Sequence, residues 1–267
     1  MKQIFIQFAV YIIALCGGVF FFEIVTTIIY KMLSIENASD NMFPAAIGSL
    51  VGSLLACRYF YKKGVLTLNR SFFSIPSSSY LIPTIVIGIS LFYIDEYLAF
   101  YLLRIFPSEL VVMEASGRMN ILLHLFSVLL VAPVFEEIVF RGVFFKTLMS
   151  RYKFSVAATI TSLLFAIIHF EPVAMPFLFM GAVLYCWVYM KTGSILLPIT
   201  LHIINNALTA ILVYGKIESD LFFSTSTVSQ HVWFICAILL LVFCLRQIQY
   251  QNKKDNLTEN FERIDVV

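Results

Sequence analysis

Charged side chains are scarce in this chain. Asp, Glu, Lys and Arg make up 13% of its 267 residues, whereas hydrophobic residues make up 60%. Soluble domains carry about 25% charged and roughly 45–50% apolar residues, so this composition excludes an ordinary water-soluble domain. The apolar residues are gathered in long blocks, which is typical of a protein that crosses a membrane several times.

A cysteine framework is also lacking. The five cysteines lie in or at the ends of apolar blocks, and no two of them form a CxxC pair. This arrangement argues against a disulfide scaffold and against a CxxC site. We therefore interpret the cysteines as small apolar core residues; they are Cys16, Cys57, Cys186, Cys236 and Cys244.

The apolar blocks predict an all-α, polytopic membrane protein with about eight transmembrane helices and a buried polar site. We expect one membrane domain over residues 1–267, a first block that is retained as a helix, and a polar, mobile tail at 247–267. The expected spans are 4–30, 43–60, 80–103, 119–149, 154–170, 173–190, 194–213 and 230–246.

Basic residues are distributed unevenly between the two sides of these spans. With both termini inside, the inner segments carry 13 Lys or Arg residues and the outer segments carry 4, while Arg141 lies inside a span. Because basic segments remain on the cytoplasmic side, we predict a multi-pass protein of the cell membrane with both termini cytoplasmic. The net charge of +2 says little about partners, and no nucleic-acid partner is expected.

The expected span at 119–149 is too long for a straight crossing. At 1.5 Å per residue it would measure about 46 Å, whereas the hydrocarbon core of a bilayer is about 30 Å thick. Pro133 lies near the middle of this span and predicts a bend there.

Ionisable and amide side chains interrupt three of the spans. Such groups are costly inside a bilayer, usually face the interior of the helix bundle and mark functional sites. They are Glu136, Glu137 and Arg141 in 119–149, His169 in 154–170, and His202, Asn205 and Asn206 in 194–213.

The two glutamates are expected to have different environments. Glu137 and Arg141 are four residues apart, so they share a helix face and can form a buried, structural ion pair. Glu136 points about 100° away from Glu137, and no basic residue stands three or four positions from it. Removal from water favours the protonated form of a carboxyl group, a property that suits a general base acting near neutral pH. Glu136 is therefore the expected functional carboxylate.

The histidines are ambiguous one by one, because a lone His in an apolar helix is more often a hydrogen-bonded core residue. Two histidines in separate spans, together with Glu136, favour a shared site. His202 and Asn206 share a helix face and can bind an oxyanion together. Glu136 and His169 each lie about 22 Å along a helix from the inner loop, and His202 lies about 13 Å from the next inner turn. With helix tilt, the three can meet inside the membrane.

Other polar groups in or near the spans are expected to have no catalytic part, because they lie near the ends of spans and outside any motif. These residues are Glu23, Asp95, Glu96, His124 and His231.

The order of these residues resembles the CPBP family of intramembrane proteases, which includes CAAX prenyl endopeptidases of the Rce1 type and the bacterial Abi proteins. The elements that match are Glu136-Glu137-x-x-x-Arg141, Phe165-x-x-x-His169 and His202-x-x-x-Asn206. The resemblance covers about residues 119–213, which would form the catalytic core.

The resemblance implies hydrolysis of a peptide bond within the membrane. Glu136 and His169 would activate a water molecule, His202 and Asn206 would stabilise the oxyanion, and Glu137 with Arg141 would be structural. The family has been described both as metal-dependent and as metal-free. A Zn²⁺ ion, if bound, would have Glu136, His169 and His202 as ligands and an open fourth position. The implied partners are membrane lipid and a peptide or protein substrate, with or without an attached lipid.

Two other classes of function stay open at this point. Buried Glu, Arg and His also serve proton-coupled transporters, although matching broken helices in two halves, common in transporters, are not evident here. A non-catalytic immunity or scaffold protein that binds a peptide would use the same fold. Motifs of other protease classes are missing from the sequence, which contains no HExxH and no GlyxGlyAsp.

Overall fold

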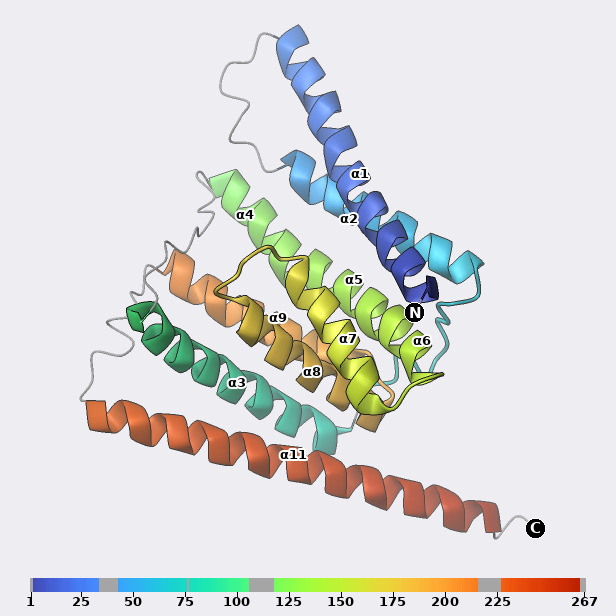
Figure 1. The fold of residues 1–267 in the computed structure, drawn as a ribbon, viewed down its shortest axis with the longest axis vertical. Helices are drawn as coiled ribbons and strands as arrows, with labels where there is room; N and C mark the ends of the chain where they lie inside the picture. The colour runs from blue at the N-terminus through green and yellow to red at the C-terminus, as the bar shows by residue number, and fades with distance from the viewer. Residues whose placement is uncertain (1, 34–42, 76, 106–117, 216–226, 265–267) are drawn as a thin grey trace. The chain divides into compact units, whose positions relative to one another are not determined.

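The computed structural model describes residues 2–33, 43–75, 77–105, 118–215 and 227–264 (Figure 1). Every regular element in these ranges is a helix, which confirms the all-α prediction. The helices are α1 (Lys2–Met32), α2 (Phe43–Lys62), α3 (Ser78–Ile105), α4 (Arg118–Phe126), α5 (Ala132–Val139), α6 (Lys146–Met149), α7 (Phe154–Ile167), α8 (Met175–Thr192), α9 (Leu196–Tyr214) and α11 (Thr227–Ile264). Two π-helical segments, η2 (Ser127–Val131) and η3 (Phe140–Phe145), join α4, α5 and α6.

The helices confirm a polytopic membrane protein. Within the described ranges, six stretches are long and apolar enough to cross a membrane: Lys2–Met32, Phe43–Lys62, Ser78–Ile105, Asn120–Met149, Leu196–Tyr214 and Val228–Asn256. The other two expected spans are also helical but are not among these six: α7 has only 14 residues, and α8, with 18 residues, is long enough but does not meet the requirement on composition. A helix of the length of α7 covers about 21 Å, less than the roughly 30 Å hydrocarbon core. Six of the eight expected spans therefore meet the requirements for a full crossing.

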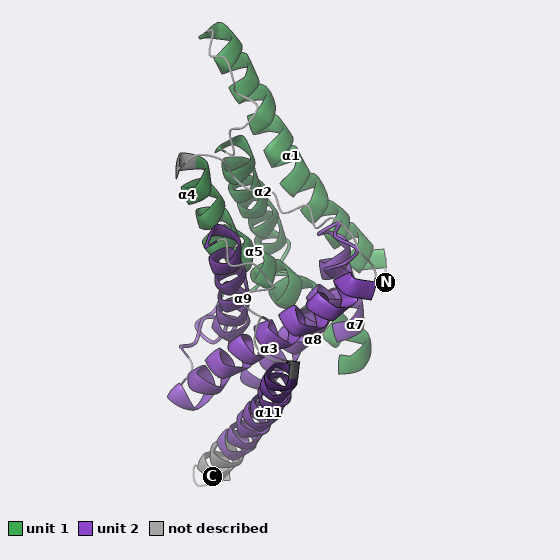
Figure 2. Ribbon diagram, turned by 90° about the vertical axis from the view of Figure 1, so that its left-hand side faces the viewer, with its two compact units in different colours: residues 1–68, 111–157 green, residues 69–110, 158–267 purple. Residues whose placement is uncertain are grey.

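The chain divides into two compact units, a subdivision that the sequence did not predict (Figure 2). Unit 1 comprises residues 1–68 and 111–157, and unit 2 comprises residues 69–110 and 158–267. Each unit therefore combines two stretches that are far apart in the sequence.

In unit 1, α1 and α2 pack with their backbones in close contact. A Cβ atom added at Gly18 would lie 2.3 Å from the carbonyl oxygen of Gly48, and one added at Gly52 would lie 2.4 Å from the carbonyl oxygen of Ala14. Small residues at such contacts let membrane helices approach each other, which increases van der Waals packing. The glycines therefore fix the position of α1 against α2.

This close contact predicts a large difference between two identical substitutions. Gly52→Ala should destabilise the protein by about 1–3 kcal/mol, as overpacking usually does, because its new methyl group would meet backbone atoms of Ala14 and Leu15. Gly17→Ala is the matched control, since a Cβ there has no atom within 4 Å. Thermal unfolding in detergent measures both, and an equal change in the two variants would contradict this packing.

Aromatic rings connect α1 and α2 to the helix that carries Glu136. Tyr11 packs edge-on against Phe140 and Phe144, with ring centroids 5.8 Å and 6.3 Å apart, and Phe60 packs against Phe144 at 6.3 Å. All four side chains are fully buried. Phe140 and Phe144 lie four and eight residues after Glu136, so they are on roughly the same side of the helix as Glu136. Tyr11, which packs against both rings, is therefore also on that side.

The helix type changes next to Pro133, where the sequence predicts a bend. Pro133 is the second residue of α5, which follows the π-helical segment η2. A proline removes one backbone hydrogen bond and its ring crowds the carbonyl four residues earlier. The wider π turn accommodates that crowding, and such turns are frequent at functional sites.

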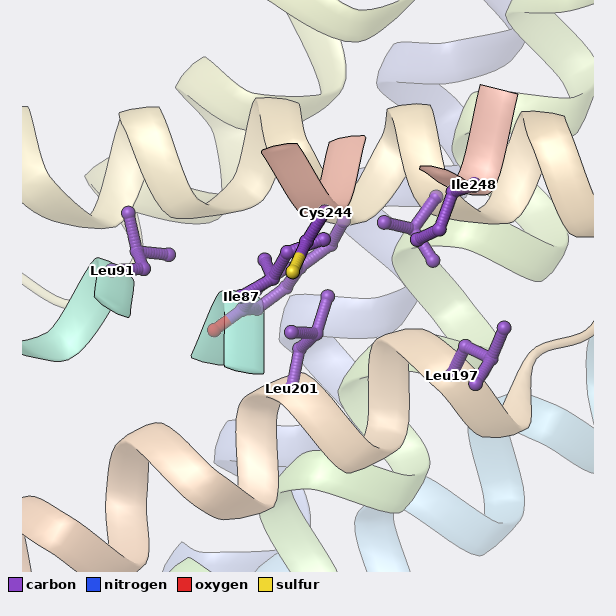
Figure 3. Close-up of a cluster of buried hydrophobic side chains, with 8 residues drawn as sticks. Ile87, Leu91, Leu197, Leu201, Cys244 and Ile248 are labelled. Atoms are coloured by element: carbon purple, nitrogen blue, oxygen red, sulfur yellow. The ribbon is translucent and has the colours of Figure 1, made fainter. Parts of the chain in front are cut away.

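The core of unit 2 is formed by α3, α8, α9 and α11 (Figure 3). It contains buried aliphatic side chains together with Tyr185 and Cys244. Cys244 lies among Ile87, Leu201 and Ile248 in this core, which supports the interpretation of this cysteine as an apolar core residue. The eight members are Ile87, Leu91, Tyr185, Val188, Leu197, Leu201, Cys244 and Ile248.

The predicted mobile tail is corrected by the structure. Residues 247–264 continue helix α11 to Ile264. The Tyr80 hydroxyl donates a hydrogen bond of 2.6 Å to the Asp255 carboxylate, and the Asn252 amide donates to the backbone carbonyl of Lys191. These hydrogen bonds hold the first turns of the polar segment against α3 and the end of α8.

Candidate active site

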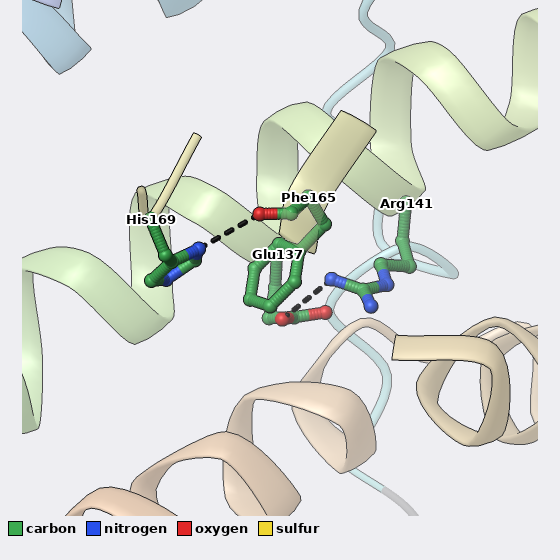
Figure 4. Close-up of polar contacts among 4 residues, drawn as sticks. All are labelled: Glu137, Arg141, Phe165 and His169. Atoms are coloured by element: carbon green, nitrogen blue, oxygen red, sulfur yellow. Dashed lines mark hydrogen bonds and ion pairs between the residues drawn. The ribbon is translucent and has the colours of Figure 1, made fainter. Parts of the chain in front are cut away.

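The predicted ion pair is present in the helix that carries both glutamates. The Arg141 guanidinium donates a hydrogen bond of 2.7 Å from Nη1 to Oε1 of Glu137, and both side chains are completely buried (Figure 4). Neighbouring side chains such as Val139, Phe140 and Val143 are also fully buried. Because an isolated charge in such surroundings is very costly, each member offsets part of the cost of burying the other.

The backbone around this pair departs from a regular α-helix. Arg141 lies in the π-helical segment η3, and the Phe140 amide is shared between the carbonyls of Glu136 and Glu137. The change from α-helix to π-helix therefore occurs between Glu137 and Arg141.

Glu136 lies in a different environment from Glu137. Its side chain is half-buried and lines a cavity of about 320 Å³ inside unit 1. The cavity wall combines residues of α1, α2 and the stretch α4–η2–α5, including Tyr11, Ser53, His124 and Ser127. The sequence interpretation had assigned no part to Tyr11 or His124. No local spacing places either residue in the cavity of Glu136, because Tyr11 lies on another helix and His124 lies twelve residues earlier in the chain.

His169 lies in the turn that follows α7, and its ring orientation is fixed. Its Nδ1 lies 2.7 Å from the backbone carbonyl oxygen of Phe165 (Figure 4). A carbonyl oxygen can only accept, so Nδ1 carries the hydrogen and the neutral ring keeps its lone pair on Nε2. Nε2 can then accept a proton or a hydrogen bond, or bind a metal ion.

The turn at His169 contains an unusual backbone conformation. Phe170 has φ of 52°, the single positive value for a residue other than glycine in the described part of the chain. The amides of His169 and Phe170 donate to the carbonyls of Ala166 and Ile167, which closes the last turn of the helix. A left-handed residue of this kind ends a helix sharply, so His169 is held at the end of α7.

His202 and Asn206 lie on one face of α9. His202 is 6% exposed, and its ring packs between Phe165 and Tyr185 with centroid distances of 5.8 Å and 5.9 Å. Phe165 also packs against His169, with a centroid distance of 4.8 Å. The two histidines therefore contact the same phenylalanine ring within unit 2.

The candidate residues are divided between the two units. Glu136, Glu137 and Arg141 belong to unit 1, whereas His169, His202 and Asn206 belong to unit 2. Among the residues that the structure describes, neither unit by itself gathers three His, Cys, Asp or Glu side chains as metal ligands. The expected Zn²⁺ ligands would thus be one residue of unit 1 and two of unit 2.

Comparison with known proteins identifies the segment that contains these residues. Residues 118–208 match the family model described as type II CAAX prenyl endopeptidase Rce1-like. This segment is therefore similar to a family of CAAX prenyl endopeptidases. The membrane-embedded CAAX protease MroQ of Staphylococcus aureus (strain USA300) is 32% identical over 95 residues, which cover 33% of this chain and 38% of that relative. No solved structure matches the chain.

All six candidate residues fall inside the matched segment, residues 118–208. This segment also contains both π-helical segments and Phe165. Helices α1, α2, α3 and α11 lie outside it. The cavity beside Glu136 is therefore built partly by the matched segment and partly by the N-terminal helices, to which the family match does not extend.

Proposed function

We propose that this membrane protein of the CAAX protease family is an intramembrane endopeptidase that hydrolyses a peptide bond of a membrane-associated peptide or protein. One observation carries the proposal. Of two adjacent carboxylates, Glu137 is held by Arg141 in a sealed environment, whereas Glu136 lines a cavity. Neighbouring carboxylates in different environments are typical of sites that assign one to structure and one to chemistry.

In the proposed mechanism, Glu136 is the general base. It takes a proton from a water molecule while the water oxygen forms a bond to the carbonyl carbon of the scissile peptide. His169 orients this water through Nε2, the ring atom that its hydrogen bond to Phe165 leaves as an acceptor. When the tetrahedral intermediate collapses, the carbon–nitrogen bond breaks and Glu136 returns the proton to the leaving amine.

His202 and Asn206 are proposed to stabilise the negative charge on the substrate carbonyl oxygen. Burial strengthens such hydrogen bonds, because little water competes with them. His202 is nearly buried between two rings, so it does not need to reorganise when charge develops. Glu137 and Arg141 act only by keeping the helix of Glu136 in its shape.

Cleavage of peptides by the purified protein in liposomes tests this function. We expect two product peptides whose formation requires the intact protein. A protein that moves a solute or protons across the liposome membrane without cleaving peptides would instead be a transporter. One that binds a peptide without cleaving it would be a scaffold or immunity protein.

Metal dependence is a separate prediction. If Zn²⁺ is bound, we propose Glu136, His169 and His202 as its ligands; the donor types fit, and Nε2 of His169 has the lone pair that coordination needs. The ion would act as a Lewis acid and make a bound water easier to deprotonate. Metal analysis should then find about one ion per chain, which is lost in His169→Ala. Full cleavage after chelation, with no metal detected, would favour hydrolysis by Glu136 without a metal.

The orientation in the membrane is also a prediction. We propose a multi-pass protein of the cell membrane with both termini in the cytoplasm, because 13 basic residues would then lie inside and 4 outside. Reporter fusions after residues 70, 153 and 267 should all give a cytoplasmic signal. An external signal from any of the three fusions would contradict this orientation.

A further inference from the structure

The cavity beside Glu136 is formed by one face of each of three helical segments. From α1 come Tyr11, Leu15 and Val19, which follow one another at intervals of four residues. Residues of α2 and of the stretch from α4 to α5 complete the wall. Because residues four apart share a helix face, the lining of α1 is a continuous stripe and not a chance contact.

The cavity extends from Glu136 toward one end of unit 1. On α2 it is lined from Ser53 to Ala45, close to where that helix begins, and on α4 it reaches Leu123. No lining residue comes from the last turns of α2 or from α6. The lining of α2 therefore comes from about the first half of that helix, and the lining of α1 begins at Tyr11, more than two turns after the start of that helix.

Tyr11 is packed against aromatic rings at the end of the cavity near Glu136, whereas the wall is built mainly from small and apolar side chains. Tyr11 forms part of this end and is held by Phe140 and Phe144. Ala45, Ala46 and Ala132 leave space that longer side chains would fill. The only charged side chain of the lining is Glu136, since the remaining polar groups are hydroxyls and the imidazole of His124.

The volume indicates the size of the occupant. A cavity of about 150 Å³ lined by apolar side chains binds benzene, and this cavity is about 320 Å³. It has room for a side chain of the size of Phe or Leu together with the adjoining peptide. Ligand pockets are generally of this kind, mostly apolar with a few polar groups that fix orientation.

We propose that this cavity is the specificity pocket for a bulky apolar side chain next to the scissile bond of a peptide substrate. The inference rests on the proposed function, because it requires that Glu136 acts on the bound peptide. It assigns substrate selection to α1 and α2, which lie outside the matched segment 118–208, together with the stretch from α4 to the start of α5 at the beginning of that segment.

Two substitutions in the wall test this pocket from opposite directions. Ala46→Phe should fill it, since Ala46 is a buried residue of the lining, and Leu123→Ala should enlarge it. Leu122→Ala is the matched control, because Leu122 is the neighbouring residue, is 56% exposed and does not line the cavity. The probes are synthetic peptides that differ only by Ala, Phe or naphthylalanine beside the bond that the wild type cleaves.

We expect the wild type to favour Phe over Ala by about 10–200-fold in kcat/KM, the usual range for apolar pockets. Ala46→Phe should remove most of this preference while cleavage of the Ala peptide continues. Leu123→Ala should improve cleavage of the naphthylalanine peptide, and Leu122→Ala should behave as the wild type does.

Three outcomes would overturn the pocket. If Ala46→Phe and Leu123→Ala remain active and keep the wild-type preference, the cavity does not select the side chain. If the preference follows an attached prenyl chain and not the side chain, the occupant is a lipid. If the wild type cleaves none of the peptides, the proposed function itself fails, and the pocket fails with it.

Discussion

Replacing Glu136 with Gln is expected to slow peptide cleavage by about 10²–10⁴-fold, the usual cost of losing a general base. The substitution keeps the shape of the side chain but removes its ability to accept a proton from water. It leaves the Glu137–Arg141 pair intact, so the variant should fold and unfold as the wild type does. Initial rates at equal amounts of folded protein in liposomes provide the measurement.

Glu137→Gln is the comparison that separates the two carboxylates. It removes the charge that holds Arg141, so we expect it to lower stability first and activity as a consequence. If Glu136→Gln cleaves as fast as the wild type while Glu137→Gln is stably folded and inactive, the roles of the two glutamates are reversed.

Arg141→Ala should produce the largest loss of stability. It would leave the carboxylate of Glu137 buried without its 2.7 Å partner, and breaking a buried pair on one side costs about 3–5 kcal/mol. The amount of protein in the membrane and its thermal midpoint in detergent should both fall. Cleavage should fall with them, in proportion to the folded fraction.

The double variant Glu137→Gln, Arg141→Met provides the control for this stability effect. Replacing a buried pair by groups without net charge is often close to neutral, so the double variant should be more stable than Arg141→Ala. A wild-type thermal midpoint in Arg141→Ala, accompanied by lost cleavage, would instead make Arg141 part of the chemistry.

The sequence predicts local features of this site well. Each expected span is helical because long apolar blocks in a membrane have few alternatives to a helix. The contact between Glu137 and Arg141 follows from a spacing of four residues, which fixes neighbours on one helix. The proximity of His169 and His202 could not be predicted from local spacing, since Phe165 of α7 contacts His202 on a different helix, α9.

Features that depend on distant residues could not be predicted. Tyr11 reaches the cavity of Glu136 through helix packing across more than a hundred residues of sequence. The polar composition of 247–267 suggested a mobile tail, but Asp255 is bound by Tyr80 from another helix. The π-helical segments also lack a sequence signal beyond Pro133, because a change of helix type reflects the surrounding packing as well as the local residues.

The candidate residues are divided between two units, so the proposed mechanism requires Glu136 of unit 1 and His169 of unit 2 to act on the same water molecule. Residues that act on the same step are strongly non-additive, so removing a second one costs little after the first. The direct test is the cleavage rate of Glu136→Gln, His169→Ala and the variant that combines them, measured in liposomes with one peptide. If Glu136 and His169 activate the same water, the combined variant should be about as slow as the slower single variant. If instead the two losses multiply, the two residues act independently and do not form one catalytic site.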